Sequence, residues 1–266
     1  MLMLSMKVMT FNLKFAVLDP PNSWLQRRPV TAEMIRSVSP DIIGTQEGLY
    51  QQIKDIKCDC PEYDWIGLGR DGGSRGEFCA IFYRSDRFEP LEFDHFWLSD
   101  TPDVVASRTW GNINVHMATW VHFRDCLTGA EFYCVNTHLD HNVQMAKEKG
   151  ARLILDRIEN SFDPSLPVIF TGDFNAIAPT DPVYDILIRQ GGFSDTWYTS
   201  KTHIGPDYAT FHNYTQPELN GPHIDWILTR GPIIAESTGV VLFDVDGQYP
   251  SDHCPVICSL LTTDKL

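Results

Sequence analysis

The segment FTGDFN ends an apolar run with side chains that could do chemistry. Asp173 and Asn175 follow the run VIF, with Gly172 directly before them. Side chains two residues apart on an extended segment point to the same face, so Asp173 and Asn175 can enter one site while Phe174 returns to the core. Gly172 permits a close approach of another backbone. We expect this segment to contribute to a functional site.

Other apolar runs end in the same way. They are VMTFN with Asn12, DIIGTQE with Glu47, FYCVNTHLD with His138 and Asp140, and HIDWIL and YPSDHCPV with Asp225, Asp252 and His253. Taken alone, Asn12 is explained by a turn and Glu47 by a helix cap. Together, carboxylates and amides beside a core are costly unless they are paired or bind a metal. Their recurrence favours one shared site.

These residue types suit metal-assisted hydrolysis. Mg²⁺ is held through one or two carboxylates plus waters and phosphate oxygens, which Glu47 and an aspartate would provide. A carboxamide such as Asn175 is able to donate to a developing oxyanion. Asp252 and His253 are adjacent in sequence, so a turn has to bring both side chains to the site.

Composition limits the function further. The 266 residues are 43% hydrophobic and 21% charged, and they contain no repeat or low-complexity linker, so we expect a single catalytic domain over 1–266. The net charge of −14 and the lack of a basic stripe argue against long duplex nucleic acid as substrate. Seven scattered cysteines indicate reduced thiols and a cytoplasmic protein. No membrane span is expected, and nothing indicates a stable protein partner.

Apolar patterning predicts many strands and few helices. The expected strands are 6–12, 41–46, 63–68, 77–84, 91–98, 115–124, 131–137, 167–172, 223–229, 238–243 and 255–261, and the expected helices are 28–39, 48–57, 142–160 and 181–190. Asn142 and Asp181 are the expected N-caps of the last two helices. This balance predicts two packed sheets with helices outside. The continuous apolar strands at 6–12 and 167–172 should be central.

The ordered series TFN, TQE, THLD, GDFNA, HIDWIL and SDHCPV resembles the endonuclease/exonuclease/phosphatase superfamily, which has the deoxyribonuclease I-like fold. The match extends from Asn12 to Pro255. Blocks such as PDIIGTQE and GEFCAIFYRSDRF are similar to a bacterial group related to the deadenylase/nocturnin branch. The resemblance implies an α/β (α+β) fold, a four-layer sandwich of two stacked, mostly antiparallel β-sheets flanked by helices. It also implies a phosphoesterase that depends on Mg²⁺, with Mn²⁺ as an alternative.

The resemblance implies roles for the residues that handle metal and water. Glu47 would be the principal Mg²⁺ ligand, with Asn12 near the metal. Asp173 would orient or deprotonate the attacking water, and Asn175 would hold that water or the phosphate oxygens.

It also implies roles on the phosphate side. His253 and His138 would contact the phosphate. Asp225 and Asp252 are the candidates to orient His253, and Asp252 is also a candidate metal ligand.

The substrate side depends on fewer residues. Where the bacterial group should have an arginine before TW, this chain has His116 in NVHMATW. Arg108 in ASRTW is a candidate replacement, with a solvated loop arginine as the alternative, and Trp110 is a candidate for stacking on a base or sugar. We expect a small or single-stranded phosphorylated substrate. The alternatives are a sequence-nonspecific nuclease acting on DNA or RNA and a non-catalytic binding protein.

Overall fold

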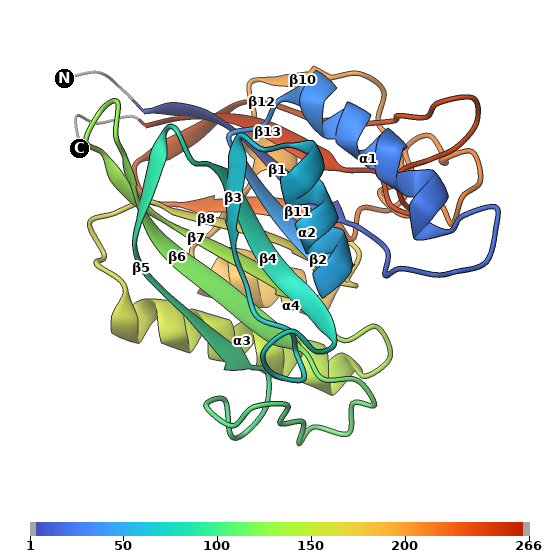
Figure 1. Ribbon diagram of the computed structural model, residues 1–266. Coiled ribbons are helices and arrows are strands. Elements are labelled where there is room, and N and C mark those ends of the chain that lie inside the picture. Colours follow the sequence, from blue (N-terminus) through green and yellow to red (C-terminus); the bar gives the residue numbers. More distant parts are fainter. Residues whose placement is uncertain (1–3, 263–266) are drawn as a thin grey trace.

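Two β-sheets packed face to face form the centre of the protein in the computed structural model, which describes residues 4–262 (Figure 1). One sheet has the strand order β10 (Thr202–Ile204), β12 (Ile233–Val240), β13 (Val256–Thr262), β1 (Ser5–Asn12), β2 (Ile42–Leu49), β4 (Glu77–Arg84) and β3 (Tyr63–Ile66). The other has the order β5 (Phe88–Trp97), β6 (Met117–Asp125), β7 (Glu131–His138), β8 (Val168–Asp173), β11 (Asp225–Arg230) and β9 (Ser194–Asp195). The expected central strands are β1 and β8, and both lie inside their sheets.

Helices cover the outer face of each sheet. α1 (Trp24–Val38) and α2 (Tyr50–Asp59) pack on the sheet that contains β1. α3 (Gln144–Ser161), α4 (Pro182–Asp185) and the π-helix η1 (Ile186–Gln190) pack on the sheet that contains β8, and the short α5 (Thr196–Thr199) contacts β11 and β12. Figure 1 shows α3 and α1 on opposite sides of the molecule. Most strand pairs are antiparallel, so the expected four-layer sandwich is confirmed.

Several expected boundaries differ from the structure. The short β9 and β10 were not predicted, and β12 begins at Ile233 rather than at 238. Asp181 caps α4 as expected, since its carboxylate accepts from the Val183 N–H. The cap assigned to Asn142 is wrong, because α3 begins at Gln144 and its N-cap residue is Val143. Asp140 accepts the N–H groups there instead, at 2.7 Å from Asn142 and 2.6 Å from Val143.

Parallel pairing brings the functional strand ends together. β1 runs parallel to β2, with Asn12 opposite Gln46, and β7 runs parallel to β8, with His138 opposite Asp173. β11 runs antiparallel to β8, so its first residue, Asp225, lies opposite Asp173. Because the carboxyl ends of parallel strands meet at one edge, the residues predicted from five separate segments converge. No helix in the described part of the chain is both long and apolar enough to cross a membrane.

Candidate active site

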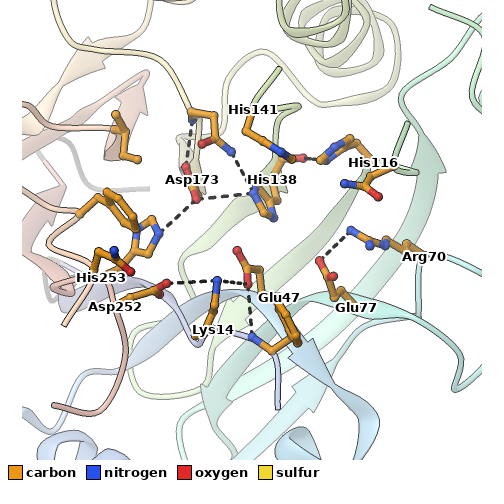
Figure 2. Close-up of a pocket in the computed structure, with 16 residues that line it drawn as sticks. Lys14, Glu47, Arg70, Glu77, His116, His138, His141, Asp173, Asp252 and His253 are labelled. Carbon is orange, nitrogen blue, oxygen red and sulfur yellow. Dashed lines mark hydrogen bonds and ion pairs between the residues drawn. The ribbon is translucent and has the colours of Figure 1, made fainter. Parts of the chain in front are cut away.

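A cavity of about 440 Å³ lies where these strand ends meet (Figure 2). Of the residues predicted for the site, those lining the cavity are Glu47, His138, Asp173, Asn175, Asp252 and His253. Asn12 and Asp225 lie directly behind the lining, since each hydrogen-bonds to a lining side chain. The structure therefore brings together eight of the ten predicted site residues within the part of the chain that it describes.

Glu47 enters the cavity through an irregular backbone. Its φ of +60° is a left-handed conformation that residues other than glycine rarely adopt, and the β2–β4 register shifts between Thr45 and Gly48. Asn12 Nδ2 donates to Glu47 Oε1 at 3.1 Å and to Asp173 Oδ2 at 2.9 Å. One amide thus links the predicted metal ligand to the predicted water-handling carboxylate.

Glu47 is ionised at neutral pH. Burial opposes its charge, but the charge of Lys14 and the hydrogen bond from Asn12 lower its pKa. The Phe15 N–H donates to Glu47 Oε2 at 3.2 Å. An ionised, partly exposed carboxylate beside other carboxylates, with room for water, is a donor set that fits a hard divalent cation.

Asp225, rather than Asp252, is placed to orient His253. His253 Nδ1 donates to Asp225 Oδ2 at 2.9 Å, and both side chains are buried. Burial disfavours the imidazolium, but the charge of Asp225 and its hydrogen bond raise the pKa of His253 to about 10. The pair therefore holds a proton at neutral pH. Donor atoms of Asp173, Asp225 and His253 all lie within 4.8 Å of one another, but a protonated His253 cannot be a metal ligand.

Asp173, Asn175 and His138 form a hydrogen-bonded cluster. The Asn175 N–H donates to Asp173 Oδ1 at 2.9 Å, and Asn175 Nδ2 lies 3.0 Å from His138 Nε2. Burial lowers the pKa of His138 to about 3, so the ring is neutral and its Nε2 accepts from the amide. Burial also raises the pKa of Asp173. His253 Nε2 lies 3.8 Å from Asp173 Oδ2, which places a cationic ring beside this carboxylate.

The backbone of the GDFN segment is turned rather than extended. Asn175 has φ +47°, so a turn places its amide beside Asp173. Phe174 is fully buried, as expected. A Cβ on Gly172 would lie 2.7 Å from the Thr137 carbonyl oxygen, which confirms the expected close approach of two backbones.

Of the residues considered for the substrate side, His116 lines the cavity and Arg108 and Trp110 do not. His116 lines the cavity, with Nδ1 donating to the His138 carbonyl at 2.8 Å and Nε2 3.3 Å from Asp140. Arg108 donates to the Ile113 carbonyl and does not line the cavity. Trp110 is buried and donates to Asp100, so it also lies outside the lining.

Two charged residues that the sequence reasoning missed form another wall of the cavity. Arg70 Nη1 lies 2.7 Å from Glu77 Oε2, and Figure 2 shows this pair beside Glu47 and His116. Trp97 Nε1 donates to the Arg70 carbonyl at 2.7 Å. Burial, opposed by Arg70 and reinforced by Glu47, raises the pKa of Glu77 to about 7. The only sequence signal was a polar residue at the start of a strand, which is common.

Lys14 also lines the cavity and was not predicted. Its Nζ lies 3.1 Å from Asp252 Oδ2 and 3.9 Å from Glu47 Oε2, so it bridges the two carboxylates in Figure 2. Phe15 and Phe211 are partly exposed at the same cavity and add apolar surface.

Comparison with known proteins relates this arrangement to a family. Residues 9–253 match the Endonuclease/Exonuclease/phosphatase family. A crystal structure of a family protein from Bacteroides thetaiotaomicron is 35% identical, with a TM-score of 0.91 over 98% of this chain and 99% of that one. A mannosyl-6-phosphatase from the same organism is 35% identical, with a TM-score of 0.90 over 96% of this chain and 99% of that one.

More distant proteins share the fold. The human nocturnin catalytic domain is 20% identical, with a TM-score of 0.75 over 96% of this chain and 94% of that one. The chain spans only 50% and 59% of the lengths of two curated relatives, which are 24% and 29% identical over the matched residues. The family match covers most of the chain and includes the strand ends described above. The chain therefore belongs to the endonuclease/exonuclease/phosphatase family of phosphoesterases.

Proposed function

We propose that this protein hydrolyses phosphomonoesters of small polar alcohols, with sugar phosphates as the first substrates to test and Mg²⁺ as the cofactor. The observation that carries the proposal is the position of Asp173, which is linked through Asn12 to Glu47 and faces the charged ring of His253 at 3.8 Å. The 35% identity to a mannosyl-6-phosphatase supports a phosphorylated sugar. The cavity volume of about 440 Å³ and the net charge of −14 support a small substrate.

Different side chains have different roles in the proposed reaction. A divalent cation held by Glu47 would supply Lewis-acid stabilisation to the phosphate oxygens. Asp173 accepts a proton from the attacking water, and its raised pKa makes it a stronger base than an exposed aspartate. Asn12 and the Asn175 N–H fix its two oxygens at 2.9 Å each. The water oxygen forms the new bond to phosphorus while the bond to the alcohol oxygen breaks, and the departing alkoxide takes a proton from solvent.

The other side of the phosphate is held by a cationic donor. His253, protonated and oriented by Asp225, donates to a phosphate oxygen. The Asn175 amide donates to His138 Nε2 and to the Leu139 carbonyl at 3.0 Å each, so it holds the neutral His138 ring beside Asp173. Because Asp225 already fixes the His253 ring, the ring needs little reorientation when negative charge develops on the phosphate oxygens.

A substrate panel tests the proposal. Purified protein with Mg²⁺, and in parallel with Mn²⁺, is incubated with mannose 6-phosphate, glucose 6-phosphate, a dinucleotide and a short single-stranded oligonucleotide. We expect inorganic phosphate from the monoesters, and its loss in Asp173→Asn. The matched control is Asp195→Asn, which changes another buried aspartate of raised pKa outside the cavity. Cleavage of the diesters alone favours the nuclease, and no turnover with either metal favours a binding protein.

A further inference from the structure

We propose that the Lys14 ammonium occupies the position of a second cation in the cavity, so that the protein binds one divalent cation per chain. This inference rests on the proposed function only in placing one divalent cation at Glu47. It goes beyond that function because it fixes the number of cations and assigns Lys14 a role.

The contacts of Lys14 are those of a bound cation. Its Nζ lies 3.1 Å from Asp252 Oδ2 and 3.9 Å from Glu47 Oε2, on the cavity floor in Figure 2. The side chain of Asp252 is only 4% exposed, so its charge requires a nearby cation. Lys14 provides that cation, because its ammonium contacts Asp252 directly and lies beside Glu47. The pair leaves Asp252 neutralised without a metal.

Hydrogen bonds hold the backbone of Lys14 in place. Its φ of +52° is left-handed, and its N–H donates to Asn12 Oδ1 at 3.0 Å. Its carbonyl accepts from Arg27 Nη2 at 3.0 Å and from Gln52 Nε2 at 2.9 Å. Because its N–H and its carbonyl are both hydrogen-bonded, the Lys14 backbone has a fixed position from which the side chain reaches Asp252.

One buried arginine connects both partners of the ion pair. Arg27 is fully buried, and its Nη1 donates to the Leu13 carbonyl and to the Pro250 carbonyl at 3.0 Å. Leu13 precedes Lys14, and Pro250 lies two residues before Asp252. The same guanidinium therefore holds the two segments in register, so the Lys14–Asp252 contact is built into the fold.

The ammonium of Lys14 lies on one side of the Glu47 carboxylate, and Glu47 would hold a divalent cation away from it. Lys14 and the Phe15 N–H lie on the side of Oε2, while Oε1 accepts from Asn12. A dication bound between Glu47 and Asp252 would have to displace the ammonium and would be repelled by it. A dication bound to Glu47 on the side away from Lys14 meets no such obstacle. The site thus accommodates one divalent cation beside the Lys14 ammonium.

Counting bound Mn²⁺ tests the inference. Isothermal titration calorimetry, with free Mn²⁺ measured by electron paramagnetic resonance, gives the number of cations per full-length chain. We expect one in the wild type and two in Lys14→Met, which keeps the length of the side chain without the charge. The matched control Lys201→Met removes a lysine that pairs with Glu236 at 2.7 Å on the surface, and it should bind one.

The outcomes separate this inference from the proposed function. Two cations in the wild type, or one or none in folded Lys14→Met, would overturn it. If Lys14→Met does not fold, Lys14→Gln serves with the same expected count, and the wild-type count decides alone if neither variant folds. Because the count needs no turnover, a protein that passes this test but hydrolyses no phosphoester loses the proposed function and keeps the inference.

Discussion

Replacing Asp225 by asparagine should move the alkaline limit of activity to a much lower pH. Asp225 Oδ2 accepts from His253 Nδ1 at 2.9 Å, and its charge is the main reason that the pKa of His253 is raised to about 10 despite burial. Asparagine has nearly the same shape but no charge. Activity needs the protonated ring in this account, so it is retained below the pKa of His253 and lost above it.

The size of the shift follows from these values. Without the charge of Asp225 the pKa of His253 should fall from about 10 toward its ordinary value of 6.5, because burial opposes the charge while Asp173 and Asp252 still favour it. A fall of roughly 3.5 units corresponds to about 5 kcal/mol of lost stabilisation of the protonated ring. With a pKa of 6.5, about 3% of the rings are protonated at pH 8, so the rate there should drop by up to roughly 30-fold.

A pH–rate profile measures the effect. The rate of phosphate release from one monoester is measured from about pH 5 to about pH 11. The control Asp125→Asn changes another fully buried carboxylate, which pairs with Arg87 at 2.8 Å away from the cavity, and should leave the alkaline limit in place. An unchanged limit near pH 10 in Asp225→Asn would refute the role assigned to the pair.

Two further substitutions test the water-handling residue and the buried support of the site. Asp173→Asn should lower the rate by roughly 10²- to 10⁴-fold. The variant should remain folded in thermal unfolding, because removing a buried charge offsets the one hydrogen-bond acceptor that asparagine loses. A variant that keeps wild-type rates contradicts the role. Arg27→Met should cost about 3 kcal/mol in urea unfolding, since it leaves buried carbonyls unpaired. Arg28→Met, on a partly exposed surface pair, should cost under about 1 kcal/mol, and equal losses would argue against Arg27 as a support.

Much of the candidate site could be predicted because its residues lie at or near the ends of buried strands. Asn12, His138 and Asp173 each close a buried strand, and Glu47 lies at the irregularity near the end of β2. Parallel pairing of β1 with β2 and of β7 with β8 brings these positions together. The choice between Asp225 and Asp252 as the partner of His253 needed coordinates, because it depends on how the turn before β13 aims adjacent side chains.

Other features depend on tertiary contacts that leave no local pattern. Arg70 lies on a glycine-rich loop and is held in place by Trp97, which is distant in sequence. Lys14 is directed by a left-handed backbone fixed by Arg27. The start of β12 was misplaced because a register shift between Ala235 and Ser237 breaks the alternation that marks a strand. β10 is exposed throughout and shows no core face.

Phosphoester hydrolysis in this cavity should require a divalent cation at Glu47. The most direct measurement is phosphate release by the wild type before and after chelation with EDTA, with Mg²⁺ then restored and Glu47→Gln measured alongside. Chelation should abolish the rate, Mg²⁺ should restore it, and Glu47→Gln should need far more Mg²⁺ for any activity. A rate that persists after complete chelation, or a Glu47→Gln variant with the same Mg²⁺ dependence as the wild type, would contradict this requirement.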